Sequence, residues 1–300
     1  MKKKKSMILL LIILLVLVAA YFALQSWNKN QEKKQQEKEK SETVYVTDID
    51  EITGIQYDVG SGKMEFNKKE DTWYDAEDPD FPLAQNYPSQ MSEDFSHLKA
   101  ERELKDGDSL EAYGLEDPVY TVVLTDSKGV KTTLYYGNAT GDSYYVTVGD
   151  TGRVYTVSST SISDLQHSLE DMAQLDTFPT IGSGNLKKEV ITENGQTTTY
   201  DSENDADAKS IATVAGGLGA VTLKQAADYS VEDKDLAGYG LDEANRTTAE
   251  VVYTVDKKDK TLTLYLGNTD TDGNRYVMMN DSRIVYLISN EICKNILNEE

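Results

Sequence analysis

Hydrophobic residues follow three patterns along the chain, and the first is an unbroken run near the N-terminus. Residues Met7–Leu24 carry no charge, and thirteen of these eighteen residues are Leu, Ile, Val or Phe. A helix of that length spans about 27 Å, close to the hydrocarbon thickness of a bilayer. Its summed insertion free energy is about −4 to −8 kcal/mol. The run therefore predicts one transmembrane helix over 7–24.

The flanks of this run indicate its orientation. The basic tail 1–6 contains Lys2–Lys5, whereas the residues that directly follow the run are uncharged. The positive-inside bias places the tail in the cytoplasm and the rest of the chain outside. A cleaved signal peptide, with Val18 and Ala20 at its cleavage site, is the alternative, and it also exports the remainder. Residues 25–42 form a Gln/Glu/Lys run without apolar periodicity, which predicts a solvated linker.

The second and third patterns, with periods of two and 3.6 residues, fill a first region over 43–180. Short strands are predicted at 55–59, 63–67 and 72–74, and four strands in a meander at 119–125, 131–137, 143–148 and 153–157. Met91, Phe95 and Leu98 lie on one face of a helix that begins near Pro88. Ser161 is expected to cap a second helix that carries Ile162, Leu165, Leu169 and Met172.

The same order recurs over 181–300, which predicts an internal duplication. The helix positions repeat with an offset of 120, so that Met91 corresponds to Ile211 and His97 to Gly217. A helix is expected at 205–218, strands at 248–255, 261–267, 275–279 and 283–288, and a last helix from about Asn290. The front of this copy is shorter and has no counterpart of Trp73. The fold class predicted is therefore α+β, with two tandem copies of an antiparallel sheet plus helices behind one transmembrane helix.

Two short motifs repeat in both copies. Tyr113-Gly114-Leu115 recurs as Tyr239-Gly240-Leu241, and Gly137-Asn138 recurs as Gly267-Asn268. We interpret Tyr-Gly-Leu as a tight turn in which glycine adopts a left-handed conformation and leucine enters the core.

Composition and charge exclude one functional class. The net charge is −22, and beyond the N-terminal lysines the chain holds 26 basic against 52 acidic residues. Nucleic-acid binding needs a basic face, so we expect no nucleic-acid partner. The acidity favours solubility, with attraction of cations or of a basic partner surface as the alternative.

Candidate catalytic chemistry is sparse. The histidines are His97 and His167, and we interpret both as surface or packing residues. The spacing would allow His167 to contact Asp164 on one helix face. The one cysteine, Cys293, forms no disulfide within the chain and fits a small buried apolar position. No catalytic residue, cofactor or metal site is predicted.

One loop resembles a calcium site in part. Asn268–Gly273 places oxygen-bearing side chains at positions one, three and five before glycine, but Met279 stands where a bidentate glutamate would be needed. A hairpin loop explains the segment equally well.

The motifs together resemble the domain-of-unknown-function 4340 family of bacterial envelope proteins. The residues that carry the resemblance are Trp73, the segment 98–104, Tyr113–Pro118, Gly137-Asn138, Tyr144-Tyr145 and Val154-Tyr155. Ala244 stands near the place of Pro118 in the second copy. The family supplies no catalytic residues, and the resemblance implies an accessory envelope role beside transporters of the ATP-binding cassette class.

The function that the sequence favours is a non-enzymatic, single-pass interaction or accessory protein of the cell envelope, anchored in the lipid bilayer through residues 7–24. An extracytoplasmic module that binds calcium or a wall-derived molecule is the alternative. An enzyme is the least favoured class, because it would require a deep cleft with converging carboxylates.

Overall fold

The computed structural model describes residues 25, 43–60, 62–105, 107–224 and 226–299. The predicted transmembrane helix over 7–24 lies outside these residues, as does most of the linker 25–42. Within the described residues, no helix combines the length and apolarity needed to cross a membrane.

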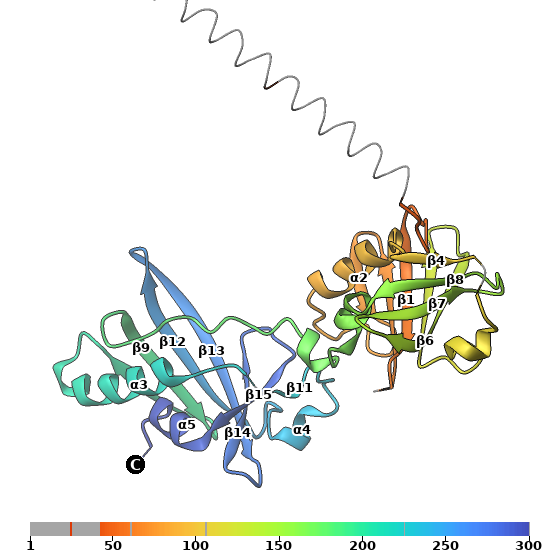
Figure 1. Ribbon diagram of the computed structural model, residues 1–300. Helices are drawn as coiled ribbons and strands as arrows, with labels where there is room; N and C mark the ends of the chain where they lie inside the picture. The colour runs from red at the N-terminus through yellow and green to blue at the C-terminus, as the bar shows by residue number, and fades with distance from the viewer. Residues whose placement is uncertain (1–24, 26–42, 61, 106, 225, 300) are drawn as a thin grey trace, which may run out of the picture. The chain divides into compact units, whose positions relative to one another are not determined.

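The first sheet is antiparallel and has eight strands, in the order β3-β2-β1-β5-β6-β7-β8-β4. We refer to the elements from β1 to η3 as the first module (Figure 1). Its elements are β1 (Ile52–Asp58), β2 (Lys63–Lys69), β3 (Thr72–Asp75), α2 (Asn86–Ser96), β4 (Arg102–Leu104), η1 (Leu110–Tyr113), β5 (Tyr120–Asp126), β6 (Lys131–Thr140), β7 (Ser143–Val148), β8 (Val154–Ser158), η2 (Ser159–Gln166) and η3 (Glu170–Met172).

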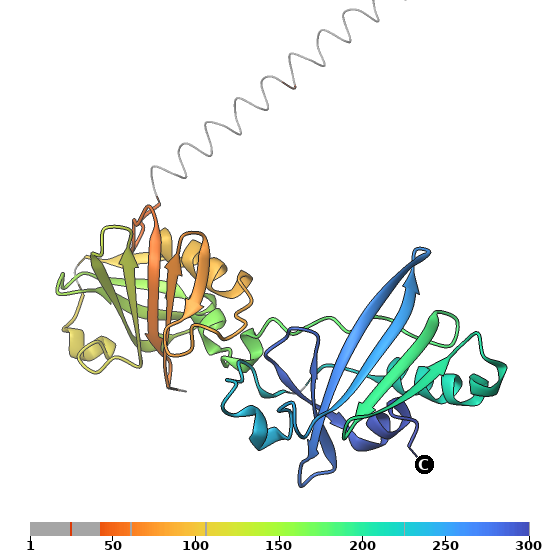
Figure 2. The ribbon, with the colours of Figure 1, turned by 180° about the vertical axis from the view of Figure 1, so that it is seen from behind.

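The second sheet is also antiparallel and has seven strands, in the order β10-β9-β12-β13-β14-β15-β11. We refer to the elements from β9 to α5 as the second module; the view from behind in Figure 2 shows its long β12–β13 pair. Its elements are β9 (Leu186–Glu193), β10 (Gln196–Asp201), η4 (Asp205–Asp207), α3 (Ala208–Ala220), β11 (Ala226–Asp228), α4 (Leu236–Tyr239), β12 (Thr247–Val255), β13 (Lys258–Thr269), β14 (Asn274–Met279), β15 (Val285–Ser289) and α5 (Asn290–Ile296).

The two strand orders correspond element by element, apart from β3. Strand β2 takes the place of β10, β1 of β9, the meander β5–β8 of β12–β15, and β4 of β11. The extra strand β3 contains Trp73, which is 3% exposed, and the described part of the second sheet has no equivalent strand. The predicted duplication is therefore visible in the topology.

Each face of the second sheet has its own apolar cluster. The larger cluster includes α3 residues such as Ile211 and Leu218, and α5 residues such as Ile296. Figure 1 shows α3 and α5 side by side. The smaller cluster contains Val231, Leu241, Met278 and Val285 on the opposite face, because Met278 alternates with Val277 and Met279 along β14. We call the face with the smaller cluster, and its equivalent in the first sheet, the outer face.

The Tyr-Gly-Leu turn is confirmed in both modules. Gly114 and Gly240 have φ values of 70° and 68°, and the leucines that follow are buried. The turn lies against the glycine of the Gly-Asn motif. A Cβ atom at Gly137 would lie 2.2 Å from the Tyr113 carbonyl oxygen, and one at Gly267 would lie 2.1 Å from that of Tyr239. Register shifts in β6 and β13 at these glycines permit the close approach.

One expectation needs correction, and two features of the fold were not predicted. The helix predicted from Ser161 to Met172 is replaced by two 3₁₀ segments, η2 and η3, although Ile162, Leu165 and Met172 are buried as expected. The Ser158 and Thr160 hydroxyls bond to each other, and Ser168 bonds to Asp171; these local hydrogen bonds compete with a regular helix. The short edge strands β4 and β11 were not predicted. Neither was the hairpin β9–β10, whose second strand is mostly exposed.

Candidate functional site

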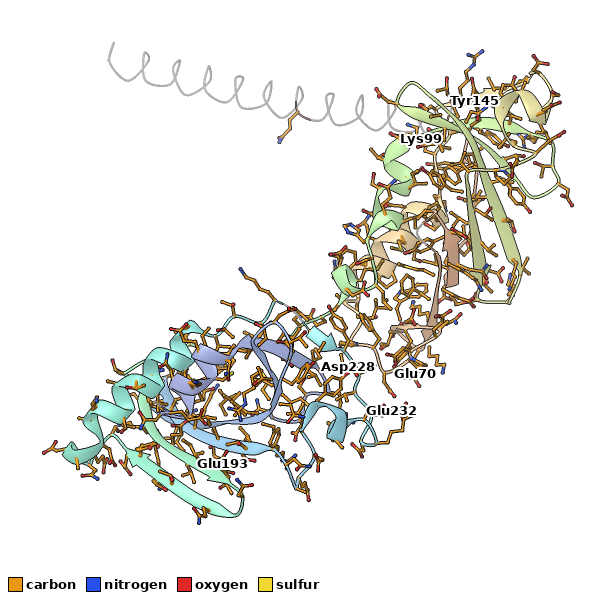
Figure 3. All side chains as sticks on the ribbon, turned by 90° about the horizontal axis from the view of Figure 1, so that it is seen from below. Glu70, Lys99, Tyr145, Glu193, Asp228 and Glu232 are labelled. Carbon is orange, nitrogen blue, oxygen red and sulfur yellow. The ribbon has the colours of Figure 1, made fainter. Side chains whose placement is uncertain are left out.

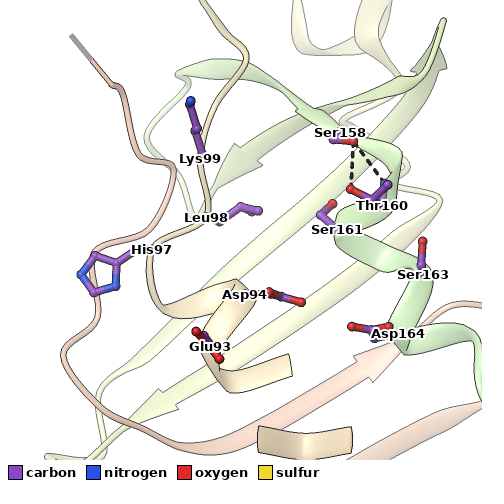
Figure 4. A pocket seen from close by; sticks show the side chains of 10 residues that line it. All are labelled: Glu93, Asp94, His97, Leu98, Lys99, Ser158, Thr160, Ser161, Ser163 and Asp164. Carbon is purple, nitrogen blue, oxygen red and sulfur yellow. Dashed lines mark hydrogen bonds between the residues drawn. The ribbon is translucent and has the colours of Figure 1, made fainter. Parts of the chain in front are cut away.

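An open groove of about 570 Å³ lies in the first module between the end of α2 and the segment η2 (Figure 4). The apolar face of α2 is turned to the core, where Met91 and Phe95 are 0% and 1% exposed. Helical spacing then directs Glu93 and Asp94 away from the core. On the other side, burial of Ile162 and Leu165 presents the intervening polar residues of η2 to the groove.

The end of α2 is fixed by a single side chain. The Thr47 hydroxyl donates to the Phe95 carbonyl oxygen at 2.6 Å and accepts from the Leu98 amide at 2.8 Å. The Val46 amide also donates to the Leu98 carbonyl oxygen at 2.7 Å. These bonds satisfy backbone groups that the helix end would leave without partners, and they hold the segment 97–99 beside the groove.

The groove is lined by carboxylates and hydroxyls. The carboxylates belong to Glu93, Asp94 and Asp164, and hydroxyls come from η2 and the end of β8. The Ser158 and Thr160 hydroxyl oxygens are 3.0 Å apart, as the dashed line in Figure 4 marks. Lys99, labelled in Figures 3 and 4, is the one lysine that lines the groove among the described residues. The groove is thus anionic and rich in hydrogen-bonding groups, which suits a cationic, hydrogen-bonding occupant.

His97 lies in the segment that lines the groove and contacts both a serine and an aspartate. Its Nδ1 is 3.1 Å from the Ser96 hydroxyl, and its Nε2 is 3.2 Å from Asp48 Oδ1. Ser96, His97 and Asp48 are residue types of a nucleophilic triad, but the proton of the serine hydroxyl is not directed at the imidazole. The Ser96 hydroxyl donates to the Glu93 carbonyl oxygen at 2.9 Å, so it has no proton to give to the imidazole. The side chain of His97 is 51% exposed, which agrees with the interpretation of a surface histidine.

His167 contacts Tyr87, and the contact with Asp164 that helical spacing would have allowed is not seen in the described part of the chain. Its ring packs edge-on against Tyr87, with centroids 5.1 Å apart. This is a packing contact, which agrees with the interpretation of His167 as a surface or packing residue. Asp164 lines the groove described above.

The second module is closed where the first has its groove. Gly217 occupies the position of His97, and a Cβ atom there would lie 2.7 Å from the Ile296 amide nitrogen. Val214 replaces Asp94 and is fully buried, and Ile296 is 1% exposed. Helices α3 and α5 therefore pack directly, and the groove is a feature of the first module.

In the loop Asn268–Gly273, the Asp270 side chain accepts hydrogen bonds from within the loop and from Asn274 next to it. Asp270 Oδ1 accepts from the amides of Asp272 and Asn274 at 2.9 and 2.7 Å, and Asp270 Oδ2 accepts from the Asn274 side chain at 3.2 Å. The backbone amide donors lower the pKa of Asp270. This geometry favours the hairpin-loop interpretation. Among the residues described, no group of three or more His, Cys, Asp or Glu side chains is arranged to hold a metal ion.

A buried thiol and a buried carboxyl group lie in the second module, away from the groove. Cys293 is fully buried, and burial raises the pKa of its thiol to about 11, which confirms its interpretation as a core residue. Glu189 in β9 is also fully buried, and neither carboxylate oxygen has a hydrogen-bond partner. Burial raises the pKa of Glu189 to about 8, so the side chain is mostly protonated at neutral pH.

These observations define a class: a chain with two tandem antiparallel-sheet modules, each closed by a Tyr-Gly-Leu turn over a Gly-Asn bulge. The family model described as "Domain of unknown function (DUF4340)" matches residues 73–200 and again residues 197–299. The chain therefore belongs to the DUF4340 family, as the sequence motifs indicated, and the two matches confirm the internal repeat. The comparisons with curated proteins and with solved structures gave no match.

Sequence reasoning missed the groove. It combines residues of α2 with residues of η2 that lie more than 60 positions later, and a predicted helix stood in place of η2. One signal was available: the aligned copies differ at His97 and Gly217, a change from a large polar side chain to none.

Proposed function

We propose that the protein is a single-pass, membrane-anchored interaction protein of the bacterial envelope whose two modules lie outside the cytoplasm. The observation that carries this proposal is the uncharged apolar run Met7–Leu24 directly after Lys2–Lys5. In this arrangement residues 1–6 are cytoplasmic, residues 25–42 link the bilayer to the modules, and no nucleic acid is bound. The protein acts as an accessory to a transporter complex of the ATP-binding cassette class.

The anchor is tested by topology mapping. A reporter enzyme that is active only outside the cytoplasm is fused to the C-terminus, and a matched fusion carries Lys2–Lys5 replaced by glutamate. The wild-type fusion should be active and should sediment with membranes, whereas the glutamate fusion should lose activity. A wild-type fusion that is inactive, or a full-length protein that stays in the soluble fraction, overturns the anchor.

We further propose that the groove between α2 and η2 receives a basic segment of a protein partner. Three carboxylates line it against one lysine, and the whole chain carries a net charge of −22. Opposite charges of this kind steer association and set specificity more than they add affinity. The interaction is therefore expected to weaken as the salt concentration rises.

Site-specific photo-crosslinking in living cells tests this docking. A crosslinking side chain is placed at Asp164 in the groove and, as the control, at Val130, which is 59% exposed and does not line the groove. The adduct should form from position 164 alone, weaken at high salt, and disappear when Glu93 and Asp94 become lysine. An adduct that is insensitive to the charge reversal, or no adduct with an envelope protein, contradicts the proposal.

A further inference from the structure

The outer faces of the two sheets differ at the position that Met278 and Thr147 share. In the second module Met278 lies opposite Tyr265 on neighbouring strands, and in the first module Thr147 lies opposite Tyr135 in the same register. Met278 is 5% exposed and packs with Val231, Leu241 and Val285. A long thioether side chain thus fills the space under the second Tyr-Gly-Leu turn.

The shorter Thr147 leaves the corresponding space of the first module open. A groove of about 450 Å³ lies there, within the size range of small-molecule sites. Thr147 lines this groove, is 3% exposed, and its hydroxyl oxygen has no hydrogen-bond partner. A buried hydroxyl without a partner is destabilising, and a ligand group that bonds to it would remove that cost.

The other walls of this outer-face groove are apolar, and carboxylates lie beside them. Leu110, Leu115, Pro118 and Tyr135 supply apolar surface, and the Tyr113 and Tyr145 rings pack next to the turn with centroids 4.7 Å apart. Tyr145 is labelled in Figure 3. Glu116 and Asp150 are exposed lining residues, and no described lining residue is cationic.

From this set of groups we infer that the outer-face groove binds a small aromatic amine that also carries a hydroxyl group. The ring lies against Leu110, Leu115 and Tyr135, since apolar contact supplies most of the affinity in such sites. The ligand hydroxyl bonds to Thr147, and the ammonium group lies near Glu116 and Asp150. This site is separate from the groove between α2 and η2 and does not depend on the anchor or on a protein partner.

The probe for this site is tyramine, titrated by calorimetry into the full-length protein. Two analogues each lack one functional group of tyramine: phenethylamine lacks the hydroxyl and p-cresol lacks the ammonium group. Tyramine should bind about 2- to 12-fold more tightly than phenethylamine, because this change in Kd corresponds to a single net hydrogen bond of 0.5–1.5 kcal/mol. It should also bind more tightly than p-cresol, which lacks the ammonium group near Glu116 and Asp150.

Three variants complete the test. Thr147→Met copies the second module and should abolish binding by filling the groove. Thr147→Val keeps the volume and removes the hydroxyl, so it should lower the affinity for tyramine to that for phenethylamine. Thr125→Val makes the same change on β5 outside the groove and should leave the affinity unchanged.

Melting curves establish that each variant is folded, and Thr147→Val decides the question if Thr147→Met is not. The inference is overturned if the wild-type protein does not bind tyramine. It is equally overturned if the ratio of the Kd values for tyramine and phenethylamine is the same for Thr147→Val as for the wild type.

Discussion

The two modules share a strand order but differ in how completely they are packed. Where the second module has Gly217 against Ile296, the first has His97 beside an open groove. Where the second has Met278, the first has Thr147 and a second groove. Both differences open the first module and close the second.

This comparison separates what the fold requires from what it tolerates. The Tyr-Gly-Leu turn, the Gly-Asn bulge and the core helix face are present in both copies, which indicates that they stabilise the module itself. The positions that differ lie around the edges of these shared features. Duplication therefore allows one copy to retain a closed core while the other presents open grooves, which is where function is expected to reside.

The largest expected effect comes from breaking the feature that both modules share. Gly137→Ala and Gly267→Ala each place a Cβ atom about 2 Å from a backbone carbonyl oxygen, so the turn must move away. Each variant should lose about 4 kcal/mol or more of unfolding free energy in its own module. Fluorescence of Trp73 in the first sheet and far-UV circular dichroism in urea provide the measurements.

Gly184→Ala is the control for these two variants, because a Cβ atom there meets nothing within 4 Å. It should change the unfolding free energy by less than about 0.5 kcal/mol. A large loss in only one of the two bulge variants would show that the shared motif stabilises only one module.

The next effect concerns the buried carboxylate of the second module. The pKa of Glu189 is raised from 4.5 in the unfolded chain to about 8 in the folded protein. The unfolded chain therefore releases this proton first as the pH rises, and stability falls by about 1.4 kcal/mol per pH unit between these two values. From pH 5 to pH 7.5 the loss from this group is about 3 kcal/mol.

Glu189→Gln keeps the shape of the side chain and removes the titration. Urea unfolding at pH 5, 6, 7 and 7.5 should show a flatter pH dependence for the variant than for the wild type. Glu250→Gln, at an exposed position of the neighbouring strand β12, is the control and should leave the wild-type slope in place. Parallel curves for Glu189→Gln and the wild type would mean that Glu189 is charged in the folded protein.

A smaller effect on the unfolding free energy is expected from loosening the contact between α3 and α5. Gly217→Ala places a Cβ atom 2.7 Å from the Ile296 amide nitrogen, and should cost about 2 kcal/mol as α5 shifts. The adjacent Gly216 has no atom within 4 Å of its Cβ position, so Gly216→Ala should stabilise the helix by up to about 1 kcal/mol. If both variants stabilise the protein, the contact with α5 is not close, and the contrast with the first module fails.

The sequence could predict those parts of this fold that depend on periodicity. Alternation located the meanders, helical spacing located α2 and α3, and the repeated motifs revealed the duplication. The three-residue strands β4 and β11 are too short for a period to be detected, and they lie at sheet edges where their partners come from distant segments. The segment η2 carries apolar residues at helical spacing, but Thr160 bonds locally to Ser158 at the end of β8.

The two grooves could be predicted only in part. Their walls combine residues from separate elements, which no local pattern reports. The exchanges of Gly217 for His97 and of Met278 for Thr147 are nevertheless visible once the copies are aligned. A difference in side-chain volume at a position shared by two repeats is thus a usable signal for an open site, even where no catalytic motif is present.

The smallest effect is expected from the reciprocal change in the first module, His97→Gly. The side chain of His97 is 51% exposed, and its contacts with Asp48 and Ser96 lie at the surface. Exposed pairs of this kind contribute about 0–1 kcal/mol, so the unfolding free energy should fall by less than about 1 kcal/mol. His97→Gln keeps a polar side chain that can form hydrogen bonds, so its unfolding free energy should lie between those of His97→Gly and the wild type. A loss as large as that of Gly217→Ala would show that His97 is part of the packed core of its module, and the two copies would then differ in sequence at this position but not in their degree of closure.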